Sequence, residues 1–561
     1  MKRLISLMLA LTALTLQAQQ RPMTGYVADL ADGRYRNPII YADYSDPDVI
    51  RVGDVFYMTS SSFNCIPGLQ ILTSHDLVNW TISGAALPHG APGQRHTGGV
   101  PQHGNQVWAP SVRWHDGRFY IFYGDPDRGI YQLHADDALG RWSDPVLVMP
   151  GKGLIDPTPL WDDDGRCYLV HALAGSRAGL KSVLLMAELD AEAEHVITPS
   201  RIIFDGHEQH PTCEGPKLYK RNGYYYIFTP AGGVSTGWQL VLRSKNIYGP
   251  YETHVALRQD STDINGPHQG AWVQTQTGED WFVHFQDIGA VGRIVHLQPM
   301  SWHNDWPVIG DDADGDGCGS PVASFRKPDV GRTWPIQIPQ TSDRFDSSTL
   351  GLQWQWQAAP QPTWYGCDAA AGHLRLYSQS LGSSTKDNCR QLWNASNLLL
   401  QKISAPDYTA IAKVRFTPCP RPTGERAGLV VMGRDYAGLI FHQDSTGSIT
   451  LSQISCQKAD RCGQETTHAI MQVERSQTLW LRVRVRTTLK AHTRPATIDD
   501  YRTECTFSYS LDGKTFYEVD APFEAREGLW IGAKVGLFCT KDKVINDSGW
   551  LDVLDFSVEA S

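Results

Sequence analysis

The first half of the chain repeats one pattern five times, and this repeat restricts the fold more than any other feature of the sequence. Each copy begins with a small or acidic residue, usually beside a proline. It continues as an alternating strand, a glycine-bearing turn and an aromatic-rich strand. The copies start at Asp46, Ala109, Asp156, Gly215 and Gly270, so successive starts are 63, 47, 59 and 55 residues apart. Alternation at a period of two around a tight turn predicts a β-hairpin in each copy.

The spacing of the copies leaves room for about four strands in each, which is the composition of a propeller blade. We therefore predict an all-β fold that begins with a five-bladed β-propeller over residues 34–335. A β-sandwich is the alternative for this half, but it would not explain why five hairpins begin alike. The aromatic residues, 10% of the chain, suit both a β-core and a sugar-binding surface.

A second domain follows a proline-punctuated break at residues 332–339. The chain of 561 residues is too long for one hydrophobic core, since single cores stop growing at about 250–300 residues. Beyond the break the strands become longer, as in YTAIAKVRF and LWLRVRVR, and the hairpin repeat stops. This pattern predicts a concanavalin-like β-sandwich over residues 342–561.

The first residues read as an export signal. Lys2 and Arg3 precede an apolar run of 13 residues from Leu4 to Leu16, and a small residue, Ala18, follows. We predict a signal peptide over residues 1–18 and a mature protein that is periplasmic or secreted. The apolar run is shorter than the roughly 20 residues of a membrane span, and no later apolar stretch reaches that length. A net charge of −10 without a basic patch argues against nucleic-acid binding.

Eleven cysteines are scattered through this chain, and an odd number leaves at least one unpaired. Cys456 with Cys462, or Cys505 with Cys539, are the pairs that the sequence leaves open.

Acidic residues stand at matching places in the repeat. Asp46 and Asp156 each precede a proline, Glu214 stands two residues before Pro216, and His268 precedes the fifth copy by a similar step. Because the innermost strands of all blades line one channel, matching positions converge there. Carboxylates brought together separate in pKa, so that one is protonated while another is ionised. Asp-Pro also opens turns, but three acids at matching offsets favour a site for acid–base catalysis of glycoside hydrolysis.

The first half resembles glycoside hydrolase family 43. The resemblance runs from Asn37 to about Pro339 and rests on NPIIYADYSDPDVI, VWAPSVRW, LIDPTPLWDDDG, EGPKLYKRNGYYYIF and GPHQGAWV. The second half resembles the β-sandwich appended to β-xylosidase-like members. The resemblance implies a five-bladed propeller that acts on arabinose- and xylose-containing polysaccharides.

The resemblance also implies roles for the three acids. Asp46 matches the general base, although Ser45 stands where the family commonly has proline. Glu214 matches the general acid, and Asp156 matches the acid that orients the proton donor and modulates its pKa. Such a pair predicts single displacement with inversion, with the carboxyl groups of base and acid roughly 6.5–9.5 Å apart.

Four further residues are candidates for contact with the sugar. Arg293 matches an arginine that hydrogen-bonds the terminal sugar, and His268 matches a histidine near the channel centre that orders a calcium ion or a water cluster in some relatives. Phe63 and Trp108 lie in the matching motifs and suit sugar platforms, with packing between blades as the alternative. We expect Trp80, in the same region, to pack in the core.

The expected activity is that of an exo-acting, inverting glycosidase on pentose-containing oligosaccharides or polysaccharide side chains. It would release terminal α-L-arabinofuranosyl residues, or β-D-xylosyl residues, from hemicellulose-derived glycans. The alternatives are a β-D-xylosidase as the main activity and a carbohydrate-binding propeller without catalysis, which would lack one of the acids. The chemistry needs no cofactor, and a structural calcium ion near His268 is left open. The sandwich could bind carbohydrate, brace the propeller or, as in resembling members, contribute to the pocket wall.

A last motif, DADGDG from Asp312, copies the start of an EF-hand loop. The twelfth position is Ala323 rather than glutamate, and no helices flank the segment. A looser calcium site or a simple acidic turn remain as interpretations.

Overall fold

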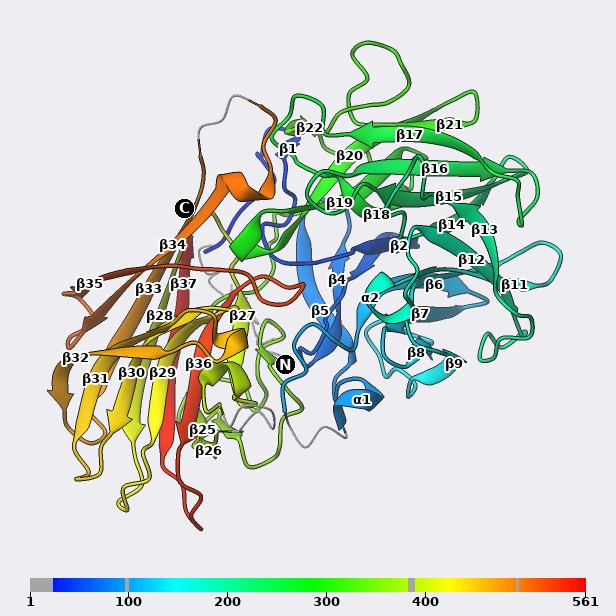
Figure 1. Cartoon of the computed structure of the whole chain (residues 1–561). Helices are drawn as coiled ribbons and strands as arrows, with labels where there is room; N and C mark the ends of the chain where they lie inside the picture. Colours follow the sequence, from blue (N-terminus) through cyan, green and yellow to red (C-terminus); the bar gives the residue numbers. More distant parts are fainter. Residues whose placement is uncertain (1–23, 96–99, 382–388, 491–493, 561) are drawn as a thin grey trace, which may run out of the picture.

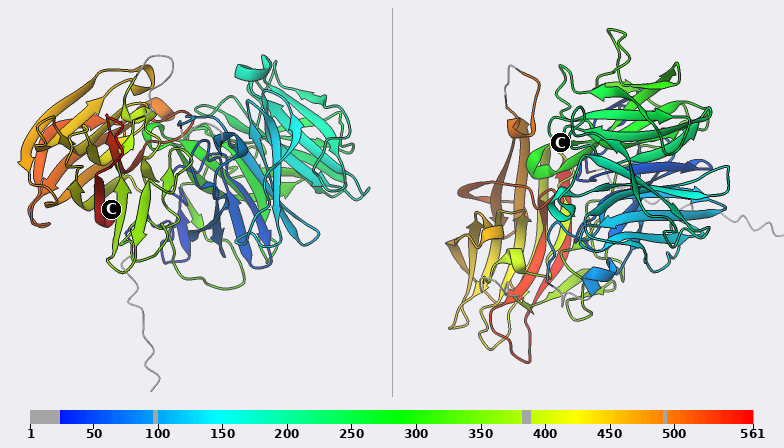
Figure 2. Two further views of the ribbon diagram at one scale, coloured as in Figure 1. Left: turned by 90° about the horizontal axis from the view of Figure 1, so that it is seen from below. Right: turned by 45° about the vertical axis from the view of Figure 1, so that its right-hand side comes forward.

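A computed structural model describes residues 24–95, 100–381, 389–490 and 494–560. The predicted signal peptide, residues 1–18, lies outside these ranges. The described chain forms two β-rich domains that lie side by side (Figures 1 and 2). Its helices are short: α1 (Pro92–Arg95), α2 (Gly175–Ala178), η1 (Gly289–Val291), η2 (Leu392–Asn394), η3 (Ala459–Arg461) and η4 (Ile498–Asp500). Within the described part of the chain, no helix has the length and apolar character of a membrane span.

The first domain is a five-bladed β-propeller, as predicted, and each blade is a four-stranded antiparallel sheet in sequence order. Blade 1 contains β2 (Asp48–Val52), β3 (Val55–Thr59), β4 (Gly68–Ser74) and β5 (Trp80–Leu87). Blade 2 contains β6 (Trp108–His115), β7 (Arg118–Asp125), β8 (Gly129–Ala135) and β9 (Val146–Pro150). Blade 3 contains β10 (Leu154–Trp161), β11 (Cys167–Leu173), β12 (Val183–Leu189) and β13 (Arg201–Asp205). Blade 4 contains β14 (Lys217–Arg221), β15 (Tyr224–Ala231), β16 (Trp238–Ser244) and β17 (Glu252–Arg258). Blade 5 contains β18 (His268–Gln274), β19 (Asp280–Asp287), β20 (Arg293–His303) and β21 (Trp306–Ile309).

The turn residues explain why the first two strands of a blade form a hairpin. Between β14 and β15 stand only Asn222 and Gly223, with φ of 50° and 75°. Asp116 and Gly117 join β6 to β7 with φ of 47° and 79°. Positive φ at both central residues defines the type I′ turn, whose twist matches that of the two strands.

Blades 1 and 5 pack against each other and close the ring. Val49 and Phe56 of blade 1 share one core cluster with Ala271 and Val283 of blade 5. The chain before blade 1 adds to this closure, because β1 (Arg34–Arg36) pairs with β22 (Ser324–Arg326), which follows blade 5. The propeller is therefore held shut by segments from both of its ends.

The second domain is a β-sandwich of two packed sheets. One sheet contains β23 (Gln355–Trp356), β27 (Leu399–Lys402), β36 (Lys534–Lys541), β29 (Arg426–Met432), β30 (Tyr436–Gln443), β31 (Ile449–Cys456) and β32 (Glu465–Val473), with β26 (Gln379–Ser380) beside β36. The other contains β24 (Tyr365–Asp368), β25 (His373–Tyr377), β37 (Trp550–Ala560), β28 (Asp407–Thr417), β33 (Thr478–Leu489), β34 (Tyr501–Ser510) and β35 (Tyr517–Glu524).

The long strands bury every second side chain. In β33, Leu481 and Val483 lie in the core between the sheets, whereas Arg482 and Arg484 face outward. This alternation is the signature of a strand with one buried face. All eleven cysteines fall in the described ranges and none forms a disulfide, so neither of the two pairs left open by the sequence is present.

The two domains are joined by backbone pairing as well as by packing. Ile66, between β3 and β4, exchanges two backbone hydrogen bonds with Trp356 of the sandwich. Ile288 and Val291 of blade 5 belong to the core cluster of the sandwich. The connecting segment is also fixed, because the side chain of Gln340 pairs with both the N–H and the C=O of Ile82. The two domains are thus connected by backbone hydrogen bonds, by a shared core cluster and by the fixed linking segment.

Candidate active site

All five blades begin with the same unusual backbone conformation. The residue at the start of each innermost strand has a positive φ, with values of 56°, 25°, 56°, 57° and 38° for Asp46, Ala109, Asp156, Gly215 and Gln269. A proline, or Gly270 in the last blade, comes next in each case. The shared conformation identifies these five residues as structurally equivalent. The five positions meet at one end of the channel because the innermost strands line it, and Asp46, Ala109, Asp156 and Gln269 line one pocket there.

The equivalence refines the positions that the sequence predicted. Asp46 and Asp156 occupy the equivalent position itself, whereas Glu214 and His268 stand one residue before it in blades 4 and 5. Gln269 occupies the position in blade 5, and no acidic residue marks it in the sequence. The functional side chains therefore come from two adjacent positions of the repeat, namely the residue with positive φ and the residue before it.

These residues line a small pocket in which about 100 Å³ is open to water-sized molecules. The lining residues are Asp46, Phe63, Trp108, Ala109, Ile155, Asp156, Glu214, Val234, Gln269, Arg293 and Trp530. All the site residues predicted from the sequence line this pocket except His268. Trp530 was not predicted, and it belongs to the sandwich, in the segment between β35 and β36.

Asp46 is held by three donors. Its Oδ2 accepts hydrogen bonds from the hydroxyl groups of Ser61, at 2.5 Å, and Ser45, at 3.1 Å. Its Oδ1 accepts one from Arg293 Nη1 at 3.2 Å. Ser61 in turn accepts a hydrogen bond from the N–H of Ala109 at 2.7 Å. The carboxylate is therefore oriented from both sides, and the arginine balances its charge.

Asp156 and Glu214 lie together beside Asp46. The Oδ2 of Asp156 accepts a hydrogen bond from the N–H of Gly215, the residue after Glu214, at 2.8 Å. Burial raises the pKa of Asp156 well above its usual value, and the negative charges of Glu214 and Asp46 raise it further. Three carboxyl groups in one site thus disfavour full ionisation, as acid–base catalysis requires.

Glu214 faces the pocket and has a histidine behind it. Its side chain is 30% exposed, while that of His268 is fully buried. The Nε2 of His268 lies 3.2 Å from Glu214 Oε1, and its Nδ1 is buried without a hydrogen-bond partner. Calcium requires six to eight oxygen ligands. Among the described residues, the group of three candidate metal ligands that lie within 4.8 Å of one another is elsewhere, at Asp312. An indirect calcium site at His268 stays a prediction.

Arg293 is almost fully buried and connects the pocket to the sandwich. Besides Asp46, its guanidinium contacts Ser45 Oγ at 2.5 Å and lies over the ring of Phe285. The N–H of Arg293 donates to Asp43 Oδ1 at 2.9 Å, and the N–H of Gly532 in the sandwich donates to Asp43 Oδ2 at the same distance. Asp43 thereby fixes the segment that carries Trp530 to the start of β20.

The approach of the chains at this joint needs two glycines. A Cβ on Gly292 would lie 2.6 Å from Asp43 Oδ1, and a Cβ on Gly532 would lie 2.1 Å from the carbonyl oxygen of Val291. A glycine at each position therefore permits the hydrogen bonds of Asp43.

The aromatic residues divide into pocket and core. Trp108 lies between Phe63, with ring centroids 6.4 Å apart, and Trp530, with centroids 5.9 Å apart, and both pairs are edge-to-face. Trp80 is buried and donates its indole N–H to the carbonyl oxygen of Leu77, in agreement with the expected core position. Three aromatic side chains, one of them from the sandwich, thus form one wall.

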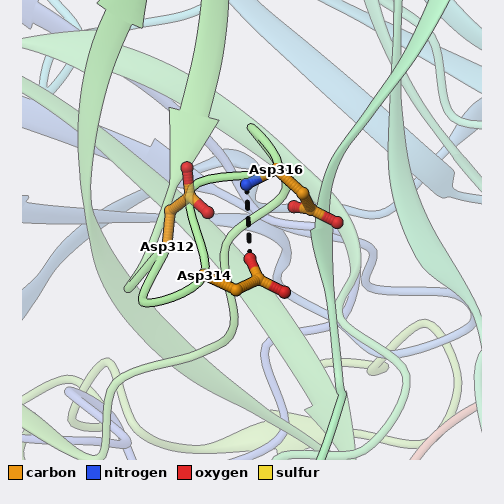
Figure 3. Close-up of side chains that lie close together, drawn as sticks. All are labelled: Asp312, Asp314 and Asp316. Carbon is orange, nitrogen blue, oxygen red and sulfur yellow. Dashed lines mark hydrogen bonds between the residues drawn. The ribbon is translucent and has the colours of Figure 1, made fainter.

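Asp312, Asp314 and Asp316 lie close together in a loop after blade 5 (Figure 3). Asp314 accepts a hydrogen bond from the N–H of Asp316, and Asp312 accepts one from the N–H of Gly317. Asp316 also pairs with Arg258 at 2.5 Å. The carboxylates thus serve the local turn, which favours the acidic-turn interpretation.

Comparison with known proteins agrees with both domains. The family model described as glycosyl hydrolases family 43 matches residues 35–307, and the one described as β-xylosidase C-terminal concanavalin A-like domain matches residues 342–559. A putative β-xylosidase of Xylanibacter ruminicola is 34% identical over 91% of this chain and 87% of its own length. A non-reducing-end α-L-arabinofuranosidase of Bacteroides ovatus is 31% identical over 72% of this chain and 75% of its own length.

Among solved structures, a xylan β-1,4-xylosidase of Bacillus halodurans has the same fold. It matches with a TM-score of 0.78 and 23% identity, over 93% of this chain and 99% of that one. The sequence relatives and the family models together identify a glycosidase. This chain belongs to glycosyl hydrolase family 43.

Proposed function

We propose that the protein is an exo-acting, inverting glycosidase that removes a terminal β-D-xylosyl residue from hemicellulose-derived glycans. The observation that carries this proposal is the single pocket in which Asp46, Asp156 and Glu214 converge beneath an aromatic wall. A pocket of this kind accepts the end of a glycan, and three acids supply the chemistry. The predicted signal peptide would place the activity in the periplasm or outside the cell.

Relatives named as β-xylosidases support xylose as the main sugar. They match over more than nine tenths of the chain, in Xylanibacter ruminicola and in Formosa agariphila. The α-L-arabinofuranosidase of Bacteroides ovatus matches over 72% of the chain, and it makes terminal α-L-arabinofuranosyl residues the second candidate. Arabinofuranose, which the sequence analysis named first, is therefore the second candidate for the terminal sugar.

Asp46 has the surroundings of a general base. The hydroxyl groups of Ser45 and Ser61 and the guanidinium of Arg293 aim the carboxylate and balance its charge. In this role Asp46 accepts a proton from a water molecule that attacks the anomeric carbon. Arg293, itself in the pocket wall, is also placed to hydrogen-bond the terminal sugar.

Glu214 has the surroundings of a general acid. Its exposed side chain reaches the pocket, and His268 behind it contacts one carboxyl oxygen. In this role Glu214 donates its proton to the glycosidic oxygen as the bond to the leaving group breaks. Asp156 fixes the backbone next to Glu214 by accepting a hydrogen bond from the N–H of Gly215.

The test is kinetic and stereochemical. The purified protein is assayed on para-nitrophenyl β-D-xylopyranoside, para-nitrophenyl α-L-arabinofuranoside and xylo-oligosaccharides, and proton NMR records the first anomer released. We expect the higher kcat/KM on the xyloside and α-xylose as the first product. β-Xylose as the first product would contradict inversion. Failure to hydrolyse any of these substrates, with retained binding of xylo-oligosaccharides, would favour a carbohydrate-binding propeller.

A further inference from the structure

Cys65 of the propeller and Lys534 of the sandwich are in unusually close contact. Lys534 Nζ lies 2.8 Å from Cys65 Sγ, and both residues are buried. Other sulfur contacts of the described chain are longer: Cys213 Sγ lies 3.2 Å from Thr229 Oγ1, and Cys419 Sγ lies 3.8 Å from Asp547 Oδ2. The amine nitrogen is therefore already within the distance that one bridging atom would span.

Among the described residues, Lys534 has no acidic partner within ion-pair distance of its Nζ. Its one other hydrogen bond in the described part of the chain goes to the amide oxygen of Gln355, at 3.3 Å. A buried cation without a carboxylate partner is unfavourable. A second lysine, Lys402, lies nearby, and its surroundings, above all desolvation and then the charge of Lys534, lower its pKa to about 7.

The pair borders a small cavity. Cys65, Lys534 and Gln355 line a space between the domains in which about 30 Å³ is open to water-sized molecules. His103 and Trp393 line the same cavity, and their rings are stacked with centroids 3.5 Å apart. The thiol and the amine thus face a shared space large enough for a molecule such as hydrogen peroxide.

The contact lies directly behind the pocket. Cys65 follows the pocket residue Phe63 by two positions, and Lys534 follows Trp530 by four. Gly532, between Trp530 and Lys534, is the residue that Asp43 holds. A covalent bond here would therefore join the segments of Phe63 and Trp530, which supply two of the three aromatic side chains of the wall.

We propose that Cys65 and Lys534 form an oxidant-induced covalent N–O–S bridge that joins the propeller to the sandwich beside the pocket. This site is independent of the proposed function, because it uses neither the acids nor a sugar. The oxidant is hydrogen peroxide, and the bridge closes a segment of 469 residues in sequence separation.

The reaction takes two equivalents of peroxide. The first oxidises the Cys65 thiol to a sulfenic acid: an S–O bond forms, the O–O bond breaks, and one water leaves. The second removes one hydrogen from the sulfenic O–H and one from the neutral amine of Lys534 as the N–O bond forms, and it is reduced to two waters. Overall, one thiol, one amine and two peroxide molecules give one N–O–S bridge and three waters. Two equivalents of a dithiol reductant supply the four electrons that return the bridge to a free thiol, a free amine and one water.

Peptide mass spectrometry of the full-length protein tests the proposal. Protein treated with hydrogen peroxide and protein treated with dithiothreitol are digested with trypsin in parallel. We expect the oxidised sample to contain the Cys65 and Lys534 peptides joined, with one added oxygen and two hydrogens lost, and without cleavage after Lys534. Dithiothreitol should remove this species. The variants Cys65→Ser and Lys534→Arg should not form it, and Cys213, which has no lysine contact, is the internal control.

Thermal unfolding gives a second readout. Oxidised wild-type protein should unfold at a higher temperature than reduced protein, and Cys65→Ser should show no such difference. If Lys534→Arg does not fold, the wild-type protein and Cys65→Ser still decide the question. Sulfenic or sulfinic acid on Cys65 with an unmodified Lys534, or joined peptides without the added oxygen, would overturn the proposal.

Discussion

Asp46 and Asp156 have the same left-handed backbone conformation, with φ of 56° in both, at the start of the innermost strands of blades 1 and 3. Each precedes a proline, which restricts the conformation of the residue before it. A non-glycine residue in such a region costs about 1–3 kcal/mol, and the surrounding structure must hold it there. The strain directs both carboxylates into the channel, where they meet Glu214. The repeat thus fixes the backbone conformation at each equivalent position, and the residue type there determines whether a carboxylate enters the channel.

Replacing the proposed base or acid should separate their roles. Asp46→Asn and Glu214→Gln should each lower kcat on xylo-oligosaccharides by roughly 10²–10⁴-fold, the usual contribution of general acid–base catalysis. On an aryl xyloside with a strongly acidic leaving group, Glu214→Gln should recover much of the loss, because such a group needs no proton. Asp46→Asn should not recover.

The control for this pair is Asp116→Asn, which makes the same chemical change in an exposed hairpin turn. Steady-state kinetics on both substrates measure the effect. Equal losses for Glu214→Gln on the two substrates would contradict its role as the proton donor.

Asp43 should act on the pocket through the backbone. Asp43→Asn can accept only one of the N–H groups of Arg293 and Gly532, because its amide nitrogen is itself a donor. Hydrogen bonds to charged groups contribute about 1.5–3 kcal/mol, so the segment that carries Trp530 should loosen. We expect a higher KM for oligosaccharides with a smaller change in kcat, measured by steady-state kinetics.

Glu425→Gln is the matched control for Asp43. Glu425 is buried in the sandwich and also accepts hydrogen bonds from two backbone N–H groups, those of Cys419 and Gly549. It should lower the unfolding temperature without raising KM. If Asp43→Asn lowers the unfolding temperature and leaves KM unchanged, the role of Asp43 is structural only.

Gln269 should donate a hydrogen bond to the sugar. It lines the pocket, is buried, and its Nε2 has no partner among the described residues. An unpaired buried donor costs about 1–3 kcal/mol, which a sugar hydroxyl would relieve. Gln269→Leu should therefore lower kcat/KM on the aryl xyloside by about 5–150-fold.

Deoxy substrates identify the hydroxyl that Gln269 contacts. The kcat/KM of wild type and Gln269→Leu is measured on aryl xylosides that lack one hydroxyl each. For the contacted position the two enzymes should have nearly equal values, because the interaction is already gone. A constant ratio on every deoxy substrate would show that Gln269 does not contact a hydroxyl.

Asp125 should make stability depend on pH. Burial is the main cause that raises its pKa from 3.8 to about 6. A carboxyl group with a raised folded-state pKa causes no loss of stability below the unfolded pKa. The loss grows as the pH rises from about 4 to 6, and it is complete above 6. Asp125→Asn retains an oxygen for the N–H of Asp127. It should therefore raise the unfolding free energy by up to about 3 kcal/mol at pH 7.5 and by little at pH 3.5. Denaturant unfolding at both pH values measures this, and an equal gain at both would contradict the assignment.

The sequence predicts the three acids because a repeat relates them. Asp46, Asp156 and Glu214 lie far apart along the chain, but each stands at or beside the equivalent position of its repeat. The turn residues and the alternating strands of each hairpin make that repeat recognisable in the sequence. Gln269 stands at that step too, but the sequence analysis assigned the fifth copy to His268, one residue earlier. The equivalent position before Gly270 was the signal that could have found it.

Trp530 and Asp43 could not be found in this way. Trp530 lies in a segment of the sandwich that has no counterpart in the propeller repeat, so no periodicity links it to the pocket. Asp43 binds two backbone N–H groups, and backbone donors leave no mark in a sequence. Both depend on how the domains dock, which local patterns do not encode.

The glycine pair where the two domains meet, Gly292 and Gly532, limits which propellers and sandwiches can be combined. Because neither position leaves room for a Cβ, a propeller from one relative and a sandwich from another will assemble a pocket only if both keep this shape. The two domains are separate folds, yet the pocket depends on one close contact between them. In a chimaera with a sandwich from another relative, that sandwich must keep the backbone segment around Gly532 that contacts Asp43.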